Sequence, residues 1–81
     1  MDVIRYRTDE GVFTGLQVNE GTKYLQIILM DSRGLRIRKV AKTEGRYITP
    51  LEYPVKRAVR KFKSAGRRFG ITKSARRALA A

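Results

Sequence analysis

Four short polar segments, each ending in glycine, divide the first half of the chain. They occupy residues 8–11, 19–21, 31–34 and 43–45. Glycine supplies the positive φ that tight hairpin turns require, and an Asp or Asn side chain in such a turn bonds to the nearby backbone. Four turns at this spacing predict five short strands and a small antiparallel sandwich or barrel. We expect the strands at residues 3–7, 12–18, 23–30, 35–41 and 46–49.

Apolar and basic side chains alternate in the first and fourth predicted strands, which is typical of strands with one buried face. The apolar members are Ile4, Tyr6, Leu35 and Ile37, and the basic members are Arg5, Arg7, Arg36 and Arg38. The third predicted strand is apolar on both faces. If Leu25, Ile27 and Leu29 fill the interior of the sheet, then Ile28 and Met30 need cover from outside. A docked amphipathic helix would supply that cover.

Residues 54–69 have a helical pattern with one apolar and one basic stripe. On a 3.6-residue helix the apolar side chains gather within an arc of roughly 120°, and the basic side chains share roughly 160° on the other side. The apolar stripe is Val55, Ala58, Val59, Phe62, Ala65, Gly66 and Phe69, and the basic stripe is Lys56, Arg57, Arg60, Lys61, Lys63, Arg67 and Arg68. We expect the apolar stripe to dock on the strands and the basic stripe to face an anionic partner. Phe62 and Phe69 have the chemistry to stack on bases, but their spacing favours packing against the sheet.

Threonine, proline and glycine mark the expected helix ends. Thr49 and Glu52 have the spacing of a capping box around a proline, which predicts a single helical turn at residues 50–53. Pro54 lacks the amide donor that a continuous helix needs, so we expect the long helix to start there and to end at Gly70.

A short basic segment follows the long helix. Thr72 is placed to cap a last helix, which would carry Lys73, Arg76 and Arg77 on its polar side. Because the apolar face of this segment is small, the alternative is a tail that stays disordered until it binds a partner.

Positive charge is concentrated at the C-terminal end. The chain has 19 Lys or Arg and 7 Asp or Glu among 81 residues, for a net charge of +12. Residues 1–54 hold nine basic and seven acidic residues, a net +2, whereas residues 55–81 hold ten basic and no acidic residues, a net +10. This density costs stability through self-repulsion, so an anionic partner is favoured over a merely solvated face. Six of the ten are arginines, whose forked guanidinium groups suit bidentate phosphate contacts.

The sequence contains no cysteine and no histidine. This composition excludes disulfides, thiolate or imidazole metal sites, cysteine nucleophiles and Ser–His catalysis. The carboxylates fall mostly in turns and at strand ends, and no glycine-rich phosphate loop precedes a helix. We therefore expect a binding protein with no enzymatic activity, no cofactor and no metal.

The length of the chain fits one domain with a limited core. We expect residues 1–53 to form the strand-built part and residues 54–81 to form a basic helical part packed on it. The N-terminus lacks a secretory pattern, and the longest apolar run is far shorter than the ~20 residues of a membrane span. The expected location is the cytoplasm, and the nucleoid if the chain comes from a bacterium or a phage.

Five short strands, glycine turns at the corners and a helical turn beside the last strand together resemble the small β-barrels of the Tudor and KOW kind, in the Src-homology-type class. The resemblance covers about residues 3–53 and is architectural. It implies a five-stranded antiparallel barrel that binds nucleic acid or peptides and is not catalytic. No residues can be assigned to a Tudor-type aromatic cage, because the aromatic candidates are scattered along the sequence. These candidates are Tyr6, Phe13, Tyr24 and Tyr47.

The same resemblance places the fifth strand between the first and the fourth. That arrangement would bring together a second basic patch of Arg5, Arg7, Arg36, Arg38 and Arg46. The alternative is that these arginines pair with Asp2, Glu44 or Glu52.

The function expected from these features is low-specificity binding of double-stranded DNA through phosphate contacts, as in nucleoid-associated or architectural proteins. Neutralising phosphates releases counterions and requires no reading of bases. The expected contact residues are Lys56, Arg57, Arg60, Lys61, Lys63, Arg67, Arg68, Lys73, Arg76 and Arg77, together with Arg36 and Arg38 of the fourth strand. The alternatives are RNA binding within a ribonucleoprotein and an adaptor role with an acidic partner protein. A membrane-surface helix is less favoured, since Ala58, Ala65 and Gly66 make the apolar stripe thin.

Overall fold

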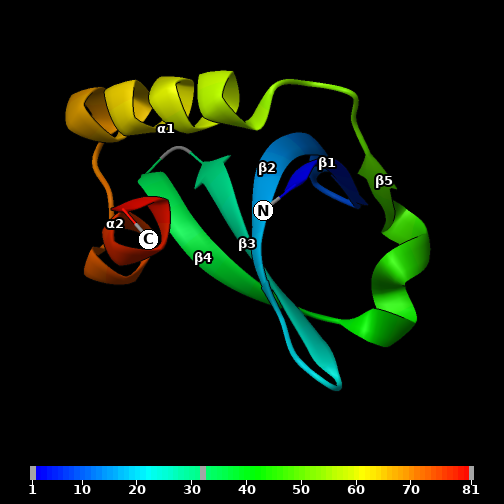
Figure 1. Cartoon of the computed structure of the whole chain (residues 1–81). Helices are drawn as coiled ribbons and strands as arrows, with labels where there is room; N and C mark the ends of the chain where they lie inside the picture. The colour runs from blue at the N-terminus through cyan, green and yellow to red at the C-terminus, as the bar shows by residue number, and fades with distance from the viewer. Residues whose placement is uncertain (1, 32, 81) are drawn as a thin grey trace.

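Five antiparallel strands followed by two helices make up the fold, as the sequence predicts (Figure 1). The structure is a computed structural model that describes residues 2–31 and 33–80, with the backbone alone at Asp31, Gly45 and Arg46. The elements are β1 (Asp2–Thr8), β2 (Gly11–Glu20), β3 (Tyr24–Asp31), β4 (Gly34–Ala41), the 3₁₀-helix η1 (Lys42–Tyr47), β5 (Ile48–Pro50), α1 (Val55–Phe69) and α2 (Lys73–Ala80). In the described residues, neither helix has the length and hydrophobicity of a membrane span.

The strands form one curled sheet in the order β4-β3-β2-β1-β5. β5 pairs with β1, with Ile4 opposite Pro50 and Tyr6 opposite Ile48. Among the described residues β5 has no ladder with β4, and Figure 1 shows η1 spanning the space between these two edges. Closure into a barrel is therefore not confirmed. We call the gap between β4 and β5, which η1 crosses, the seam.

Two local predictions around the seam are wrong. The segment 43–45 is not a hairpin turn but lies inside η1, because the chain must cross from one edge of the sheet to the other instead of returning beside β4. The helical turn expected at residues 50–53 does not form. Pro50 ends an edge strand, where a missing amide donor is tolerated, and the Leu51 amide donates to the Val3 carbonyl at 2.9 Å. Extended pairing with β1 therefore prevails over the capping-box pattern.

The sheet is apolar on both faces, as its third strand predicts. One face, together with the helices, forms the helix-facing cluster of Val3, Leu16, Ile28, Leu35, Ala58, Ala75 and Leu79. The other face forms the inner cluster of Ile4, Tyr6, Ile27, Leu29 and Val40. Ile28 is covered by the helices as expected, whereas Met30 is 40% exposed. The expectation for Met30 is wrong because this residue lies near the end of β3, beside the β3–β4 turn.

α1 docks through its apolar stripe, with Ala58 and Gly66 buried and Phe62 packed against the helix-facing cluster. Small residues allow this close approach: a Cβ on Gly66 would lie 3.3 Å from the Leu35 side chain. Phe69, in contrast, is 57% exposed, so its predicted packing is wrong. It occupies the last helical position, after which the chain turns at Gly70 toward β4.

The connection between the helices is fastened to the first residues of β4. The Leu35 amide donates to the Gly70 carbonyl at 2.9 Å, and the Thr72 amide donates to the Leu35 carbonyl at 3.1 Å. The predicted cap is confirmed, since the Ala75 amide donates to the Thr72 hydroxyl at 3.2 Å. α2 is helical over Lys73–Ala80 with two side chains in the core, so the structure shows the helical alternative and not the disordered one.

The backbone crossing at Gly34 gives a stability prediction. Gly34 has φ +112°, and a Cβ there would overlap the Gly70 carbonyl group, whereas Gly11 has φ +140° with nothing near its Cβ position. Gly11→Ala should cost the ~1–3 kcal/mol of positive-φ strain alone. Gly34→Ala should lower the free energy of unfolding further, because the helix connection must also move. Urea denaturation of both variants measures the difference, and equal losses would contradict the close approach.

Candidate nucleic-acid interface

The outward face of α1 is a row of exposed cations. All seven predicted basic residues of this helix are exposed: Lys56, Arg57, Arg60, Lys61, Lys63, Arg67 and Arg68. Within residues 2–31 and 33–80, none of them takes part in an ion pair. The basic stripe therefore carries its charge into solvent while the opposite stripe holds the helix on the sheet.

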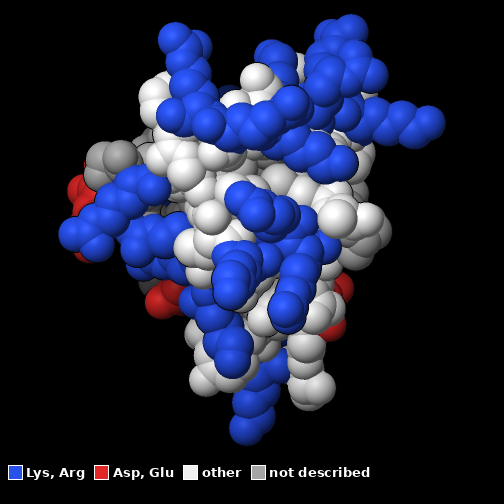
Figure 2. Space-filling view, turned by 90° about the vertical axis from the view of Figure 1, so that its left-hand side faces the viewer, with Lys and Arg blue, Asp and Glu red and all other residues white. Residues whose placement is uncertain are grey.

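α2 adds its three predicted cations to the same surface. Lys73, Arg76 and Arg77 are exposed, while Ala75 and Leu79 face the core. The i, i+3, i+4 spacing of the three cations places them together on the outward side of this helix. Figure 2, which faces the side on which α2 lies in Figure 1, shows Lys and Arg side chains crowded along the top, over α1, and continuing down the middle. We call these ten residues of α1 and α2 the basic helix surface.

A shallow groove separates the two helices within the basic helix surface. Its volume is about 250 Å³. Lys63 and Arg67 line it from α1 and Arg76 lines it from α2, above an apolar floor of Ile71 and Leu79. Cations thus stand on both sides of a narrow depression, an arrangement suited to an extended anionic chain. We call it the interhelix groove.

The opposite flank of α1 contacts the segment that precedes the helix. The Lys61 ammonium lies 5.3 Å from the centre of the Tyr53 ring. A hydrogen bond from Lys61 to the phenol oxygen is the main cause that lowers the pKa of Tyr53; burial opposes it, and the positive charges of Lys61 and Arg57 lower it further. Lys61 is therefore partly engaged within the molecule, unlike the cations beside the interhelix groove.

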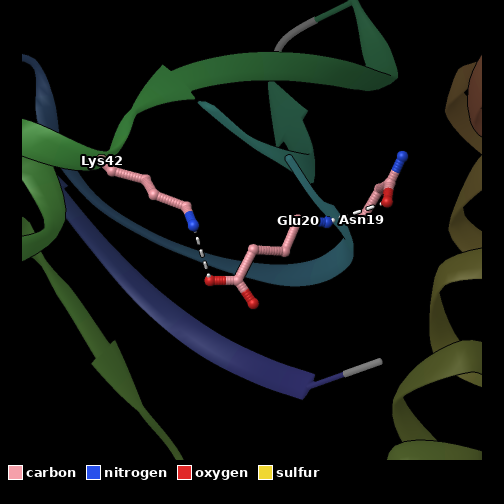
Figure 3. A network of polar contacts seen from close by, with 3 residues as sticks. All are labelled: Asn19, Glu20 and Lys42. Atoms are coloured by element: carbon pink, nitrogen blue, oxygen red, sulfur yellow. Dashed lines mark hydrogen bonds and ion pairs between the residues drawn. The ribbon is translucent and has the colours of Figure 1, made fainter. Parts of the chain in front are cut away.

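None of the acidic residues lies on α1 or α2. Among the described residues, a carboxylate–ammonium contact joins Glu20 at the end of β2 to Lys42 at the start of η1, at 3.2 Å (Figure 3). The Glu20 amide also donates to the Asn19 side-chain oxygen at 2.9 Å. An exposed pair of this kind contributes about 0–1 kcal/mol. The pair engages a cation of the strand-built part and no cation of the basic helix surface.

The second basic patch predicted on the sheet does not form as one surface, although two of its members, Arg7 and Arg38, line a common recess. Arg36 lies opposite Leu29 and Arg38 opposite Ile27, on the face of the inner cluster. Arg5 and Arg7 alternate with the inner-cluster residues of β1, so they belong to the opposite face. β5 pairs with β1 and not with β4, which removes the arrangement that the prediction assumed. The side chain of Arg46 lies outside the described residues.

Sequence reasoning missed a polar recess at the seam, which we call the seam pocket. It has a volume of about 510 Å³ and is lined by Tyr6, Arg7, Thr8, Asp9, Arg38, Glu44 and Tyr47. These residues come from β1, the β1–β2 turn, β4 and η1, so no local sequence signal marks the pocket. Only the curl of the sheet, which brings β4 toward β1, could have shown it.

Comparison with known proteins gives no family for this chain. No protein-family model, curated protein or solved structure matches it. Among the described residues, no group of three or more carboxylates is placed to hold a metal ion. A function therefore has to be argued from the geometry and charge of the basic helix surface.

The contact between Lys61 and Tyr53 can be tested by titration. In Lys61→Met the hydrogen bond and the positive charge are lost, so the pKa of Tyr53 should rise toward its ordinary value. Arg60→Met, which removes a neighbouring cation that does not act on Tyr53, should leave it unchanged. NMR titration of the tyrosine ring signals measures both. An unchanged pKa of Tyr53 in Lys61→Met would show that this flank of α1 does not contact Tyr53.

Proposed function

We propose that this protein binds double-stranded DNA with little sequence preference, through phosphate contacts made by the basic helix surface. The observation that carries the proposal is the sorting of charge. Ten exposed cations share two adjacent helices, and none of them is paired with a carboxylate of the described residues. A surface of this kind repels itself and is relieved by a polyanion.

The dimensions of the helices favour a long polyanion over a small anion. α1 has 15 residues, which corresponds to a length of about 22 Å. A DNA duplex carries one negative charge per ~1.7 Å along its axis, so it matches an extended row of cations. The guanidinium groups of α1 and α2 suit its phosphates, and the surface offers no constellation that singles out a base. We infer an architectural or nucleoid-associated role in the cytoplasm.

The strand-built part supports this interpretation as a platform. A curled five-stranded sheet with a 3₁₀-helix across its seam is compatible with the small barrel that the Tudor and KOW resemblance implies, and modules of that kind bind nucleic acid or peptides. Under this proposal the sheet holds the two helices in a fixed relation. Arg36 and Arg38 then lie on the inner face and are secondary to the helices as phosphate contacts.

An adaptor role with an acidic partner protein is the second candidate. It is favoured by one observation: Phe69 is 57% exposed at the end of α1, with the Arg68 guanidinium 5.6 Å from its ring centre. An exposed aromatic residue within a basic surface is a suitable anchor for a protein partner. Capture experiments repeated after nuclease treatment discriminate, because an acidic protein partner survives digestion and a nucleic-acid bridge does not.

A salt titration tests DNA binding. If the basic helix surface neutralises about six phosphates, the slope of log K against log salt should be near −5. Affinity for a duplex should then fall by roughly three decades between 50 and 200 mM salt. Fluorescence anisotropy with a labelled duplex measures it, and an RNA duplex of equal length tests the RNA alternative. Weak binding at 50 mM salt, or a slope near zero, would contradict the proposal.

Two triple variants of equal charge test where the phosphates lie. Lys63, Arg67 and Arg76, which line the interhelix groove, are changed together to Gln; the matched control changes Arg57, Lys61 and Arg68 to Gln on the other flank. The groove variant should reduce the magnitude of the salt slope by about 2.7, because cations from both helices surround one anionic strand there.

The control variant should change the slope by less, since Lys61 is engaged with Tyr53. Circular dichroism confirms that both variants keep their helices. Equal losses in the two variants would contradict a binding surface centred on the interhelix groove.

A further inference from the structure

The basic helix surface does not account for the seam pocket, which lies on the strand-built part. At about 510 Å³ it is twice the size of the interhelix groove. It lies where β4 and β5 fail to pair, with Tyr6 from β1, Arg38 from β4, and Glu44 and Tyr47 from η1. β1 and the consecutive elements β4 and η1 thus supply aromatic, cationic and anionic groups to one place.

The seam pocket combines one buried tyrosine with exposed charged groups. Tyr6 is the aromatic member of the inner cluster and is only 4% exposed, and the other four members are aliphatic. Burial is the main cause that raises the pKa of Tyr6; the positive charge of Arg38 opposes it, and the Glu44 carboxylate adds to it. The Arg38 guanidinium lies 5.7 Å from the centre of the Tyr6 ring. Tyr6 is thus a buried tyrosine in an otherwise aliphatic cluster, and its hydroxyl needs polar groups near it. Arg38 and Glu44 are exposed, so a ligand in solvent can reach them.

The charges at the seam pocket narrow the kind of ligand. Among the described lining residues, two cations, Arg7 and Arg38, stand beside two carboxylates, Asp9 and Glu44, in a protein whose net charge is +12. The carboxylates disfavour a free phosphate, and the arginines disfavour a cationic peptide side chain. What fits is a neutral, planar group that carries both donors and acceptors and can lie against aromatic rings.

We propose that the seam pocket binds a single unpaired nucleobase, and that guanine is the base it fits best. Guanine presents two acceptors, O6 and N7, that match the fork of an arginine such as Arg38. Its N1–H and exocyclic N2–H₂ groups are donors that match a carboxylate such as Glu44. Tyr47 provides an aromatic surface for the base, as in proteins that read unstacked bases.

The base site extends the proposed function without depending on it. A base inside a duplex cannot reach such a pocket, so the site would act on a single-stranded segment, a loop or a chain end. The basic helix surface would still hold phosphates if the seam pocket were empty. Failure of one site therefore leaves the other measurable.

Nuclear magnetic resonance titration of the ¹⁵N-labelled chain with GMP tests the site. GMP should shift the amides of residues 6–9, 38, 44 and 47 in a saturable way, while inorganic phosphate should shift only those of α1 and α2. AMP, CMP and UMP should bind the seam at least about tenfold more weakly, the discrimination that one good bidentate base contact supplies. Shifts confined to the helices, or equal shifts with all four nucleotides, would overturn the guanine assignment.

Variants separate recognition from folding. Glu44→Gln and Arg38→Gln should each weaken GMP binding about tenfold. Glu52→Gln, at an exposed carboxylate outside both the seam pocket and the basic helix surface, should not. The spectrum of each variant reports whether the fold is kept, and two independent variants keep the test decisive if one of them unfolds. Unchanged GMP binding in both folded seam variants would overturn the proposal.

A competitor and two oligonucleotides complete the experiment. N-acetylarginine amide serves as the competitor. If it displaced GMP from the seam pocket, or bound the pocket more tightly than GMP does, the pocket would be a site for a peptide side chain and the proposal would be overturned. Two nine-nucleotide oligomers, oligo-dT and oligo-U, each with one central guanine, then distinguish DNA from RNA as the source of the base. The strand with the guanine should shift the seam amides, and the same strand without it should shift only the helices.

Discussion

The structure depends on the close contact between the C-terminal end of α1 and the start of β4. Gly66 lets the helix approach Leu35, and Gly34 lets the backbone of β4 meet the Gly70 carbonyl without a side chain between them. Two hydrogen bonds from this junction then set the position of α2. Because the contact is made by backbone and small side chains, it fixes the helices at short range and leaves their long basic side chains free to point outward.

This docking explains why the charge is sorted. An apolar stripe that must cover Ile28 and Leu35 cannot hold cations, so the basic residues of α1 occupy the remaining arc of the helix. The acids of the chain lie on the strand-built part, where Glu20 pairs with Lys42. Packing explains why the basic residues lie on the outward side of the helices. It does not explain why they are so many, because packing requires only polar residues there, and the two helices carry ten cations and no acid.

Local patterns predicted the helices and strands well, since their causes are local. The apolar stripe of residues 54–69, the stop at Gly70 and the Thr72 cap each depend on neighbours in sequence. The errors arose where distant segments compete. The capping box lost to the Leu51–Val3 hydrogen bond, Phe69 lay beyond the sheet that was meant to cover it, and the strand arginines were assigned one face before the register was known. The basic helix surface was therefore found from sequence, and the seam pocket was not.

The length of β5 decides the shape of the seam. With three residues, β5 pairs only with Ile4 to Tyr6 of β1, and it begins at Ile48 because the residues before it belong to η1. The far end of β1, at Arg7 and Thr8, therefore projects past its β5 partner and lines the seam pocket together with η1. A longer fifth strand would close this gap with backbone hydrogen bonds and leave no room for a ligand. The short strand that weakens the case for a closed barrel is thus the same feature that creates the polar recess.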